Sequence, residues 1–361
     1  MTTTASTNAP RISTRKPIDL ALQGGGSHGA FTWGVLDALL EDERFDFSAI
    51  SGTSAGALNA AVMVSGFAKD GRTGARQALT DFWHDISSAG GTFSPFSGSQ
   101  QNAVDSSYGV DKLPGYQWMS SFFRSFSPYE FNPLNLNPLR KVLHDHVNLQ
   151  ALHSSDIDLF ITATSVRTGQ ARVFTGPEIS IDALLASACL PFVFQAIEID
   201  GEPYWDGGYT GNPALFPLIY DSQALDLLLV KINPLSRPGV PKRTVDIIDR
   251  VSEITFNASL IGEMRAISFV TRLLKENKLD SAQYKSLRLH MVADDEGLSA
   301  FNANSKFDTN RAFLEQLFRL GRIAAERWLA MHSKNVGIKS TLDIDAEFLG
   351  KSAHKNTAKA P

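Results

Sequence analysis

The stretch from Phe47 to Val62 constrains the fold more than any other part of this sequence. A short apolar run, residues 47–50, leads into Gly52-Thr-Ser54-Ala-Gly56, and an Ala-rich segment follows directly. This order predicts a strand, a tight turn and a helix, because glycines leave room for the strand and the helix to approach closely. Ser54 is then held in a strained backbone conformation, with its hydroxyl at the end of the sheet and at a helix N-terminus. That place suits a nucleophile.

The pentapeptide alone is a weak indication. With ordinary amounts of Gly and Ser, an accidental G-x-S-x-G occurs in about one chain in ten of this size. Few accidental copies lie between a strand pattern and a helix pattern, so the context favours a functional turn.

A second glycine-rich turn follows the first predicted strand, residues 17–22. Gln23-Gly-Gly-Gly-Ser-His-Gly29 separates that strand from a helical pattern over residues 30–40. Its bare backbone N–H groups can approach an anion closely, which favours an oxyanion hole. The spacing also matches the dinucleotide fingerprint, but the second strand ends in Ile50-Ser-Gly-Thr-Ser54 without the acid that this reading requires. A plain structural turn is the other alternative.

The rest of the chain predicts one large α/β domain over residues 17–340. Helices are expected over 57–67, 73–87, 138–147, 181–189, 244–277 and 311–332, a hairpin over 158–174, and strands over 195–200, 202–206, 225–232 and 287–292. The segment 88–137 is rich in Gly, Pro, Ser and aromatic residues, so we interpret it as a lid-like insertion that either lines a greasy pocket, contacts a membrane or packs on its own domain. Residues 1–16 and 341–361 are expected to be a disordered tail and a solvated tail.

Composition excludes several classes of protein. The 361 residues are 43% hydrophobic with a formal net charge of −4, so a large core forms without metal or disulfides and a nucleic-acid binder is not expected. Cys189 is the single cysteine and sits in a small-residue run, which is typical of a core residue. No signal peptide and no membrane-spanning run is seen, so we expect a cytoplasmic protein, with peripheral contact at membranes left open.

A serine hydroxyl needs a base before it can attack. His290 lies in mid-strand, His332 ends a helix, and His153 precedes the candidate acid, so each is a weak choice. A carboxylate can take the proton itself if burial raises its basicity. Asp206, followed by Gly207 and Gly208 after an aromatic strand end, has the right setting, although alone it would be an ordinary turn aspartate.

The three motifs together resemble the signatures of patatin-like phospholipases. They are Gly24-Gly-Gly-Ser-His-Gly29, Gly52-Thr-Ser-Ala-Gly56 and Asp206-Gly-Gly208, in this order, and Ser187-Ala-Cys-Leu-Pro191 resembles the proline-containing block that precedes the Asp loop in that family. The resemblance covers about residues 18–213. It implies a three-layer α/β/α sandwich with a mostly parallel central sheet, here with a long aromatic insertion and a helical C-terminal region.

The resemblance also implies roles for particular residues. Ser54 is the nucleophile and Asp206 the base of a dyad that needs neither metal nor cofactor. The oxyanion hole is expected from Gly24, Gly25, Gly26 and Ala55, with Gly29, Gly52, Gly56, Gly207 and Gly208 supporting the turns. One departure is His28, which stands where family members often carry Arg or Lys, so the preference for a phosphate headgroup is open.

These residues predict a lipid acyl hydrolase acting on a lipid or fatty-acyl ester through an acyl-enzyme on Ser54. Two alternatives remain: a Ser-His-Asp esterase with a histidine base such as His290, and a catalytically silent lipid-binding protein on the same scaffold. The sequence does not decide among phospholipid, neutral lipid and polyester substrates, and it leaves the oligomeric state open.

Overall fold

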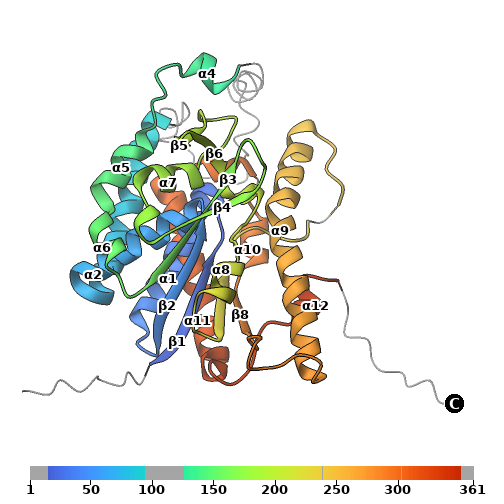
Figure 1. Cartoon of the computed structure of the whole chain (residues 1–361). Coiled ribbons are helices and arrows are strands. Elements are labelled where there is room, and N and C mark those ends of the chain that lie inside the picture. The colour runs from blue at the N-terminus through green and yellow to red at the C-terminus, as the bar shows by residue number, and fades with distance from the viewer. Residues whose placement is uncertain (1–14, 94–125, 238, 302, 351–361) are drawn as a thin grey trace, which may run out of the picture.

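A single mixed β-sheet lies at the centre of the molecule (Figure 1). The computed structural model describes residues 15–93, 126–237, 239–301 and 303–350. Within these residues the sheet has eight strands: β1 (Lys16–Leu22), β2 (Phe45–Thr53), β3 (Asp158–Ser165), β4 (Ala171–Thr175), β5 (Ile197–Ile199), β6 (Glu202–Asp206), β7 (Asp226–Val230) and β8 (Arg288–Val292). They are ordered β5-β6-β3-β2-β1-β7-β8, and β4 also pairs with β3.

The middle of this sheet is parallel. The pairs β3–β2, β2–β1, β1–β7 and β7–β8 all run in the same direction, whereas β4 and β6 run antiparallel to β3. Unbroken apolar runs such as residues 227–230 of β7 fit this arrangement, because parallel strands are covered by helices on both faces. The expected mostly parallel sheet is confirmed.

One edge of β3 is shared by two strands that meet end to end. β2 pairs with residues 158–162 of β3, and β6 pairs with residues 163–165. Because β4 overlaps both sets of residues on β3, it must occupy the opposite edge, so β2 and β6 lie on the same one. β2 ends at Thr53 opposite Thr162, and β6 ends at Asp206 opposite Ala163. The turns that follow the two strands are therefore brought together.

Helices cover both faces of the sheet, and alternating side chains of the strands build the two cores. In β1, Leu20 and Leu22 pack in one core and Ala21 packs in the other. The first core is covered by α1 (Gly29–Glu41), α2 (Ala55–Phe93), α5 (Pro138–His146), α7 (Ile181–Ser187) and α11 (Arg311–His332). The second is covered by α8 (Phe216–Tyr220), α9 (Thr244–Lys275) and α12 (Ile344–Glu347), which Figure 1 shows on the opposite side from α2 and α5. The three-layer α/β/α sandwich predicted from the sequence is confirmed.

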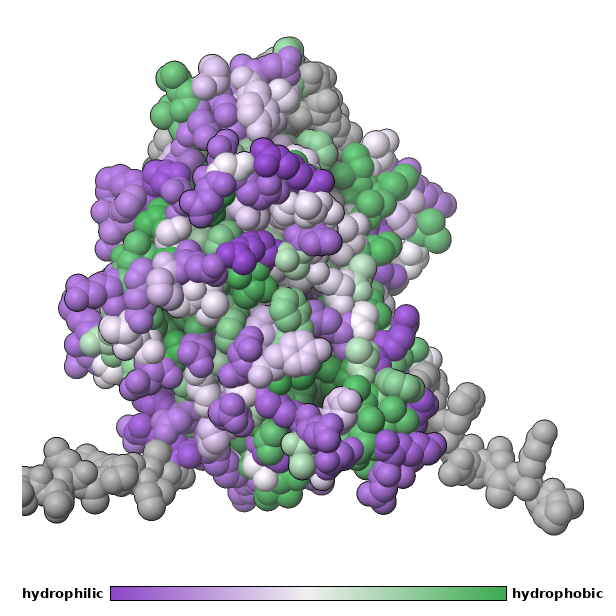
Figure 2. Space-filling view, in the orientation of Figure 1, coloured by the Kyte–Doolittle hydropathy of each residue, from purple (hydrophilic) through white to green (hydrophobic). Residues whose placement is uncertain are grey.

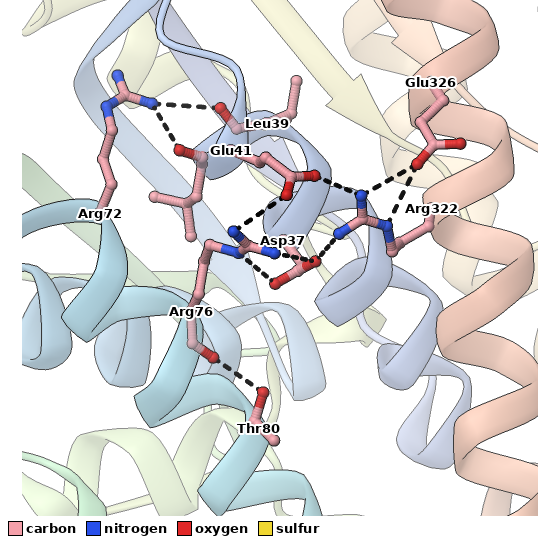
Figure 3. Close-up of polar contacts among 9 residues, drawn as sticks. Asp37, Leu39, Glu41, Arg72, Arg76, Thr80, Arg322 and Glu326 are labelled. Atoms are coloured by element: carbon pink, nitrogen blue, oxygen red, sulfur yellow. Dashed lines mark hydrogen bonds and ion pairs between the residues drawn. The ribbon is translucent and has the colours of Figure 1, made fainter.

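Three helices of the first layer are joined by an ionic cluster (Figure 3). Asp37 of α1 is 5% exposed and accepts from Arg76 of α2 at 2.7 Å and from Arg322 of α11. Arg322 also bonds Glu41 at 2.5 Å and Glu326 at 3.0 Å. A buried carboxylate requires such partners, since an unpaired charge in a low-dielectric interior is costly. The cluster fixes α1, α2 and α11 relative to one another.

The remaining elements are short. They include α4 (Pro128–Phe131), α6 (Leu149–His153) and α10 (Asp295–Ser299), and the 3₁₀ turns η1 (Gly26–His28), η3 (Gly176–Glu178), η4 (Gly207–Tyr209), η5 (Ala303–Phe307) and η6 (Ser333–Asn335). The α2 segment bends at Asp70 and Gly71, whose dihedrals are not helical, so the two helices expected there are joined end to end. Among the described residues, no helix has both the length and the apolar character that a membrane crossing needs.

Two of the expected segments fall partly outside the described residues. The lid-like insertion 88–137 includes residues 94–125, which lie outside them, while α2 continues to Phe93 and α4 begins at Pro128. Residues 1–14 and 351–361 of the expected tails lie outside as well. Residues 341–350 differ from the solvated tail that we expected, because they form α12 and bury Phe348 in the second core.

Candidate active site

Ser54 lies in the turn between β2 and α2, with a φ of 54°. Residues other than glycine rarely adopt this left-handed backbone conformation. It turns the chain from strand to helix within one residue. The flanking glycines are required by contact: a Cβ at Gly56 would lie 2.2 Å from the Leu22 carbonyl oxygen, and one at Gly52 would lie 2.8 Å from Ala57. The strained serine predicted from the sequence is confirmed.

Ser187 fixes the backbone of this turn. Its hydroxyl accepts a hydrogen bond from the Ser54 N–H at 2.9 Å and donates to the Thr162 carbonyl at 2.6 Å. Ser187 is fully buried at the end of α7. Both hydrogen bonds of the hydroxyl are thus used to hold Ser54 against β3.

Asp206 ends β6 and is fully buried. Its Oδ1 accepts from the Gly208 N–H at 2.7 Å, and its own N–H donates to the Cys189 carbonyl at 2.8 Å. Gly207 is required at the next position, because a Cβ there would lie 2.1 Å from the Thr162 carbonyl oxygen. The block 187–191 therefore holds both turns, through Ser187 to Ser54 and through Cys189 to Asp206.

Burial raises the pKa of Asp206 to about 7, despite the opposing effects of the Gly208 N–H, the Ser54 hydroxyl and the charge of Lys306. Oδ2 of Asp206 has no hydrogen-bond partner among the described residues. The Ser54 hydroxyl is thus near enough to lower the pKa of this carboxyl, but it falls short of a well-formed hydrogen bond. Catalytic hydrogen bonds are often long before a substrate is bound.

The glycine loop lies beside this pair. A Cβ at Gly24 would be 2.6 Å from the Ser54 Cβ, and one at Gly29 would be 2.5 Å from the Ala55 Cβ. Ala55 is the first residue of α2, so its N–H has no partner within the helix. In the described part of the chain, the N–H groups of Gly25 and Gly26 make no hydrogen bond. The glycine loop thus lies against Ser54 and Ala55, and the N–H groups of Gly25, Gly26 and Ala55 remain candidates for the oxyanion hole, whereas that of Gly24 does not.

The exception is Gly24. Its N–H donates to Oδ1 of Asn212 at 2.7 Å, so it is not available to a substrate oxygen. The prediction that Gly24 contributes a donor to the oxyanion hole is contradicted by this bond. Gly24 serves instead as the residue that brings the loop against Ser54.

A network of buried amides supports the glycine loop. Gln23 accepts at Oε1 from the Ile232 N–H at 2.9 Å and from the Asn233 N–H at 3.0 Å, and Nδ2 of Asn233 donates to the Gly24 carbonyl at 2.7 Å. Gln23 also reaches the Asn212 carbonyl and Oδ1 of Asn257. Sequence reasoning missed these residues; the Gln before the glycines and the Asn233-Pro234 after a buried strand were the available signals.

His28 is buried in the same loop. Its Nε2 lies 2.7 Å from the Ser305 hydroxyl, and its ring packs against Phe301 and Phe313. Burial, followed by the charges of Lys306 and Arg237, lowers the pKa of His28 to about 3. The ring is therefore neutral at neutral pH.

The other histidine candidates are not placed to act on Ser54. Nε2 of His290 bonds Asp226 at 3.0 Å and Nδ1 bonds Thr341 at 2.9 Å, so both ring nitrogens are engaged. β8 is also separated from β2 by β1 and β7, which amounts to roughly 14 Å across the sheet. His153 bonds the Ile179 carbonyl at 2.8 Å. The structure thus contradicts the use of His290 as the base.

Cys189 is buried beside Asp206. Its thiol contacts the Gln195 carbonyl oxygen at 3.1 Å, and burial followed by the charge of Asp206 raises its pKa to about 12. A thiol that stays protonated is a poor nucleophile. The interpretation of Cys189 as a core residue agrees with this setting.

Comparison with protein families gives a match over the first part of the chain. A model of the family described as "Patatin-like phospholipase" matches residues 20–219, which is more than half of the 361 residues. This range contains the glycine loop, the Ser54 turn and the Asp206 turn. No match was found among curated proteins.

The solved structures that match this chain include those of two bacterial proteins. VipD from Legionella pneumophila shares 13% identity at a TM-score of 0.32, with 85% of this chain and 67% of VipD covered. Full-length ExoU from Pseudomonas aeruginosa, solved with SpcU, shares 15% identity at a TM-score of 0.30, with 87% and 53% covered. A second structure of the ExoU–SpcU complex shares 16% identity at a TM-score of 0.32, with 94% of this chain and 58% of that chain covered. The chain thus spans between about half and two thirds of the length of these proteins. Likenesses with TM-scores this low carry no argument about function.

Proposed function

Because the chain belongs to the patatin-like phospholipase family, we propose that it is a lipid acyl hydrolase that uses Ser54 as nucleophile and Asp206 as base. The family supports hydrolysis of lipid acyl esters in general, and the roles of the two residues are our inference. The observation that carries it is the end-to-end meeting of β2 and β6 along one edge of β3. That arrangement puts an alcohol in a strained turn beside a buried carboxyl whose Oδ2 has no partner among the described residues.

The proposed reaction has two halves. In the first, Oγ of Ser54 attacks the ester carbonyl carbon while Asp206 takes the hydroxyl proton; the C–O bond then breaks, and the leaving alcohol receives that proton. In the second half, the water oxygen attacks the acyl-enzyme carbonyl carbon while Asp206 takes a proton from the water. That proton then passes to Oγ of Ser54 as the fatty acid leaves. The N–H groups of Gly25, Gly26 and Ala55 would bind the oxyanion that forms in each half.

The basicity of Asp206 supports this mechanism. An ordinary aspartate has a pKa near 3.8 and is too weak a base to deprotonate an alcohol, whereas burial raises the pKa of Asp206 to about 7. At neutral pH such a carboxyl is partly ionised and can both accept and return a proton. No histidine is needed in this scheme.

Hydrolysis of a chromogenic fatty-acyl ester by the purified chain tests the proposal. Ser54→Ala should abolish turnover with the fold intact, and a panel of phospholipids, neutral lipids and polyesters read by the mass of the released products would define the substrate. Full activity of the Ser54→Ala variant would overturn it. Lipid binding without any turnover by the wild type would favour the silent lipid-binding protein.

We further propose that α9 contacts the lipid surface. Its outer face carries Ile247, Ile248, Val251 and Ile254, between 43% and 57% exposed, and Figure 2 shows this hydrophobic patch over the first half of α9. The opposite face of the same helix reaches the site, where the Phe256 ring lies 5.0 Å from that of Tyr209. Exposed Lys242 just before the helix suits anionic headgroups, whereas the neighbouring Arg243 pairs with Asp246 at 2.7 Å. A helix with apolar residues outward beside a lipid-hydrolysing site is suited to an interface.

Sedimentation with vesicles that contain phosphatidylglycerol tests this contact. Replacing Ile247, Val251 and Ile254 by Ser should weaken vesicle binding by about tenfold or more while leaving hydrolysis of a dissolved short-chain ester unchanged. Ile323→Ser and Met331→Ser, on the exposed face of α11, provide the matched control. Unchanged vesicle binding of the triple variant would contradict the proposal. Loss of self-association in that variant would instead identify the face as a contact between two copies.

A further inference from the structure

The glycine loop is covered by a segment from the C-terminal part of the chain. The 3₁₀ turn η5 (Ala303–Phe307) packs against η1. Gly26, which has a φ of 59°, is a residue of η1 in contact with η5. A Cβ at Gly26 would be 2.3 Å from the Lys306 carbonyl oxygen. The backbone of Lys306 therefore contacts the loop that presents Gly25 and Gly26, although η5 lies outside the matched residues 20–219.

The side chain of Lys306 reaches the same loop through Asn233. Its ammonium donates to Oδ1 of Asn233 at 2.8 Å, and Nδ2 of Asn233 donates to the Gly24 carbonyl at 2.7 Å. An ammonium has donors only, so it fixes which end of the amide faces it. With Oδ1 turned to Lys306, the NH₂ group must face Gly24. The ammonium thus sets the orientation of the amide that holds the loop.

The charge of Lys306 also acts on the site. It lowers the pKa of Asp206, of His28 and of Glu253. Burial is the largest effect on each pKa, and Lys306 acts less than Gly208 and Ser54 on Asp206 and less than Arg237 on Glu253. His28 is neutral at neutral pH, so the histidine within the loop supplies no positive charge there. Arg237, the other cation that acts on His28, bonds Glu253 at 2.8 Å and the Ser299 carbonyl at 2.6 Å. The guanidinium of Arg237 is therefore engaged with α9 and with the segment before η5.

We propose that Lys306 is a positioning residue of the oxyanion loop: its ammonium holds Asn233 against Gly24 and supplies positive potential to the N–H groups of Gly25 and Gly26. This inference rests on the proposed hydrolase function. When Ser54 attacks, negative charge forms on the substrate carbonyl oxygen, and a fixed cation beside the donors lowers the energy of that state. The same cation favours the ionised form of Asp206, which is the form that accepts the proton.

The groups that surround these two residues are neutral or already paired. Around Asp206 they are Ser54, Cys189 and Tyr209, and burial raises the pKa of both the thiol and the phenol to about 12. Around Lys306 the described residues include Asn233, neutral His28, and Glu253, which is paired with Arg237 and Arg250. Removal of the Lys306 charge is therefore expected to act on Asp206 directly.

Two variants and a control test the proposal. Lys306→Met removes the charge, Lys306→Arg keeps it, and Lys278→Met removes an exposed lysine that pairs with Glu276 just beyond the C-terminal end of α9. The protonation of Asp206 is read by infrared titration of the buried carboxyl, with the matching Asp206→Asn protein as the reference. This readout needs no turnover, and circular dichroism checks that each variant is folded.

Lys306→Met should move the Asp206 titration to higher pH, shift the acid limb of kcat/KM with it, and lower kcat at pH 7 by about 10- to 100-fold with little change in KM for a neutral ester. Lys306→Arg should restore most of both properties, and Lys278→Met should match the wild type. An unmoved titration in a folded, active Lys306→Met protein would overturn the role of Lys306 alone. A folded wild type that hydrolyses no ester would contradict the hydrolase function and with it this role.

Discussion

Ser54 and Asp206 are each held through their backbone N–H groups, and Asp206 also through Oδ1, which accepts from the Gly208 N–H. The Ser54 N–H is bound by Ser187, and the Asp206 N–H is bound by the carbonyl of Cys189. Oγ of Ser54 and Oδ2 of Asp206, the atoms that we propose to react, therefore stay available while the two residues are fixed. Such support from neighbouring residues is what allows a strained turn to persist at a reactive position.

The sequence pointed to the two residues of the proposed dyad more clearly than to the residues around them. Both stand in short motifs whose glycines are needed for contact with the neighbouring backbone. These glycines are visible in the sequence next to Ser54 and Asp206. Lys306 and Asn233 act through long-range hydrogen bonds that leave no local pattern. The Gly24 N–H was misjudged for the same reason, because its acceptor, Asn212, lies far along the chain.

Asp206→Asn should stabilise the protein at alkaline pH. The pKa of Asp206 is raised from 3.8 to about 7 in the folded state, so ionisation destabilises the fold progressively as the pH rises through this range. Above about pH 7 the variant should gain on the order of 2–4 kcal/mol of unfolding free energy, and below pH 4 the difference should vanish. Asn keeps the Oδ1 acceptor for Gly208. Urea unfolding at pH 4 and pH 8 measures the effect; equal stabilities at pH 8 would show that Asp206 is not a strained base.

Ser187→Ala should reduce kcat by about 10- to 100-fold without unfolding the chain. The substitution leaves the Ser54 N–H without its acceptor and frees the turn, at a cost of about 1–2 kcal/mol in stability. Ser65→Ala is the matched control. It removes a buried hydroxyl of α2 that donates to the Ala61 carbonyl, and it should lose stability but not activity. Wild-type kcat in Ser187→Ala would argue against its positioning role.

At the scale of elements, the helix α11 completes the first layer through contact with α1. The two helices cross where each has a glycine: a Cβ at Gly34 would lie 2.0 Å from the Phe318 carbonyl oxygen, and one at Gly321 would lie 2.0 Å from that of Phe31. The sequence pattern predicted both helices within a residue or two, since amphipathic spacing is a local signal. It did not predict which helices touch, because that depends on the three-dimensional path of the chain.

Gly321→Ala should lower the free energy of unfolding by about 1–3 kcal/mol, because the helices must move apart to admit the methyl group. Gly262→Ala on α9 is the control, since nothing lies within 4 Å of the added Cβ. There the substitution should be neutral or stabilising by up to about 1 kcal/mol, as alanine is the better helix former. Chemical denaturation of both proteins measures the difference, and equal stabilities would contradict the close crossing of α1 and α11.

At the scale of the whole molecule, the fold class followed from the sequence because buried parallel strands and amphipathic helices have different periodicities. The meeting of β2 and β6 on β3 did not follow from it, because strand order is not written in any local pattern. The family match ends at residue 219, yet β7 pairs with β1, and α9 and α11 cover the two faces. The later part of the chain therefore completes the sheet, both cores and the surroundings of the glycine loop.

The rate at which a fluorophosphonate probe labels Ser54, followed by intact mass across pH, tests the central claim most directly, because it needs no knowledge of the lipid substrate. If Asp206 is the base, the wild-type rate should rise with pH through about pH 7, and folded Asp206→Asn should label at least about 100-fold more slowly at pH 8. Labelling of Asp206→Asn at the wild-type rate would contradict the account. So would a probe that modifies the Ser54→Ala protein equally well.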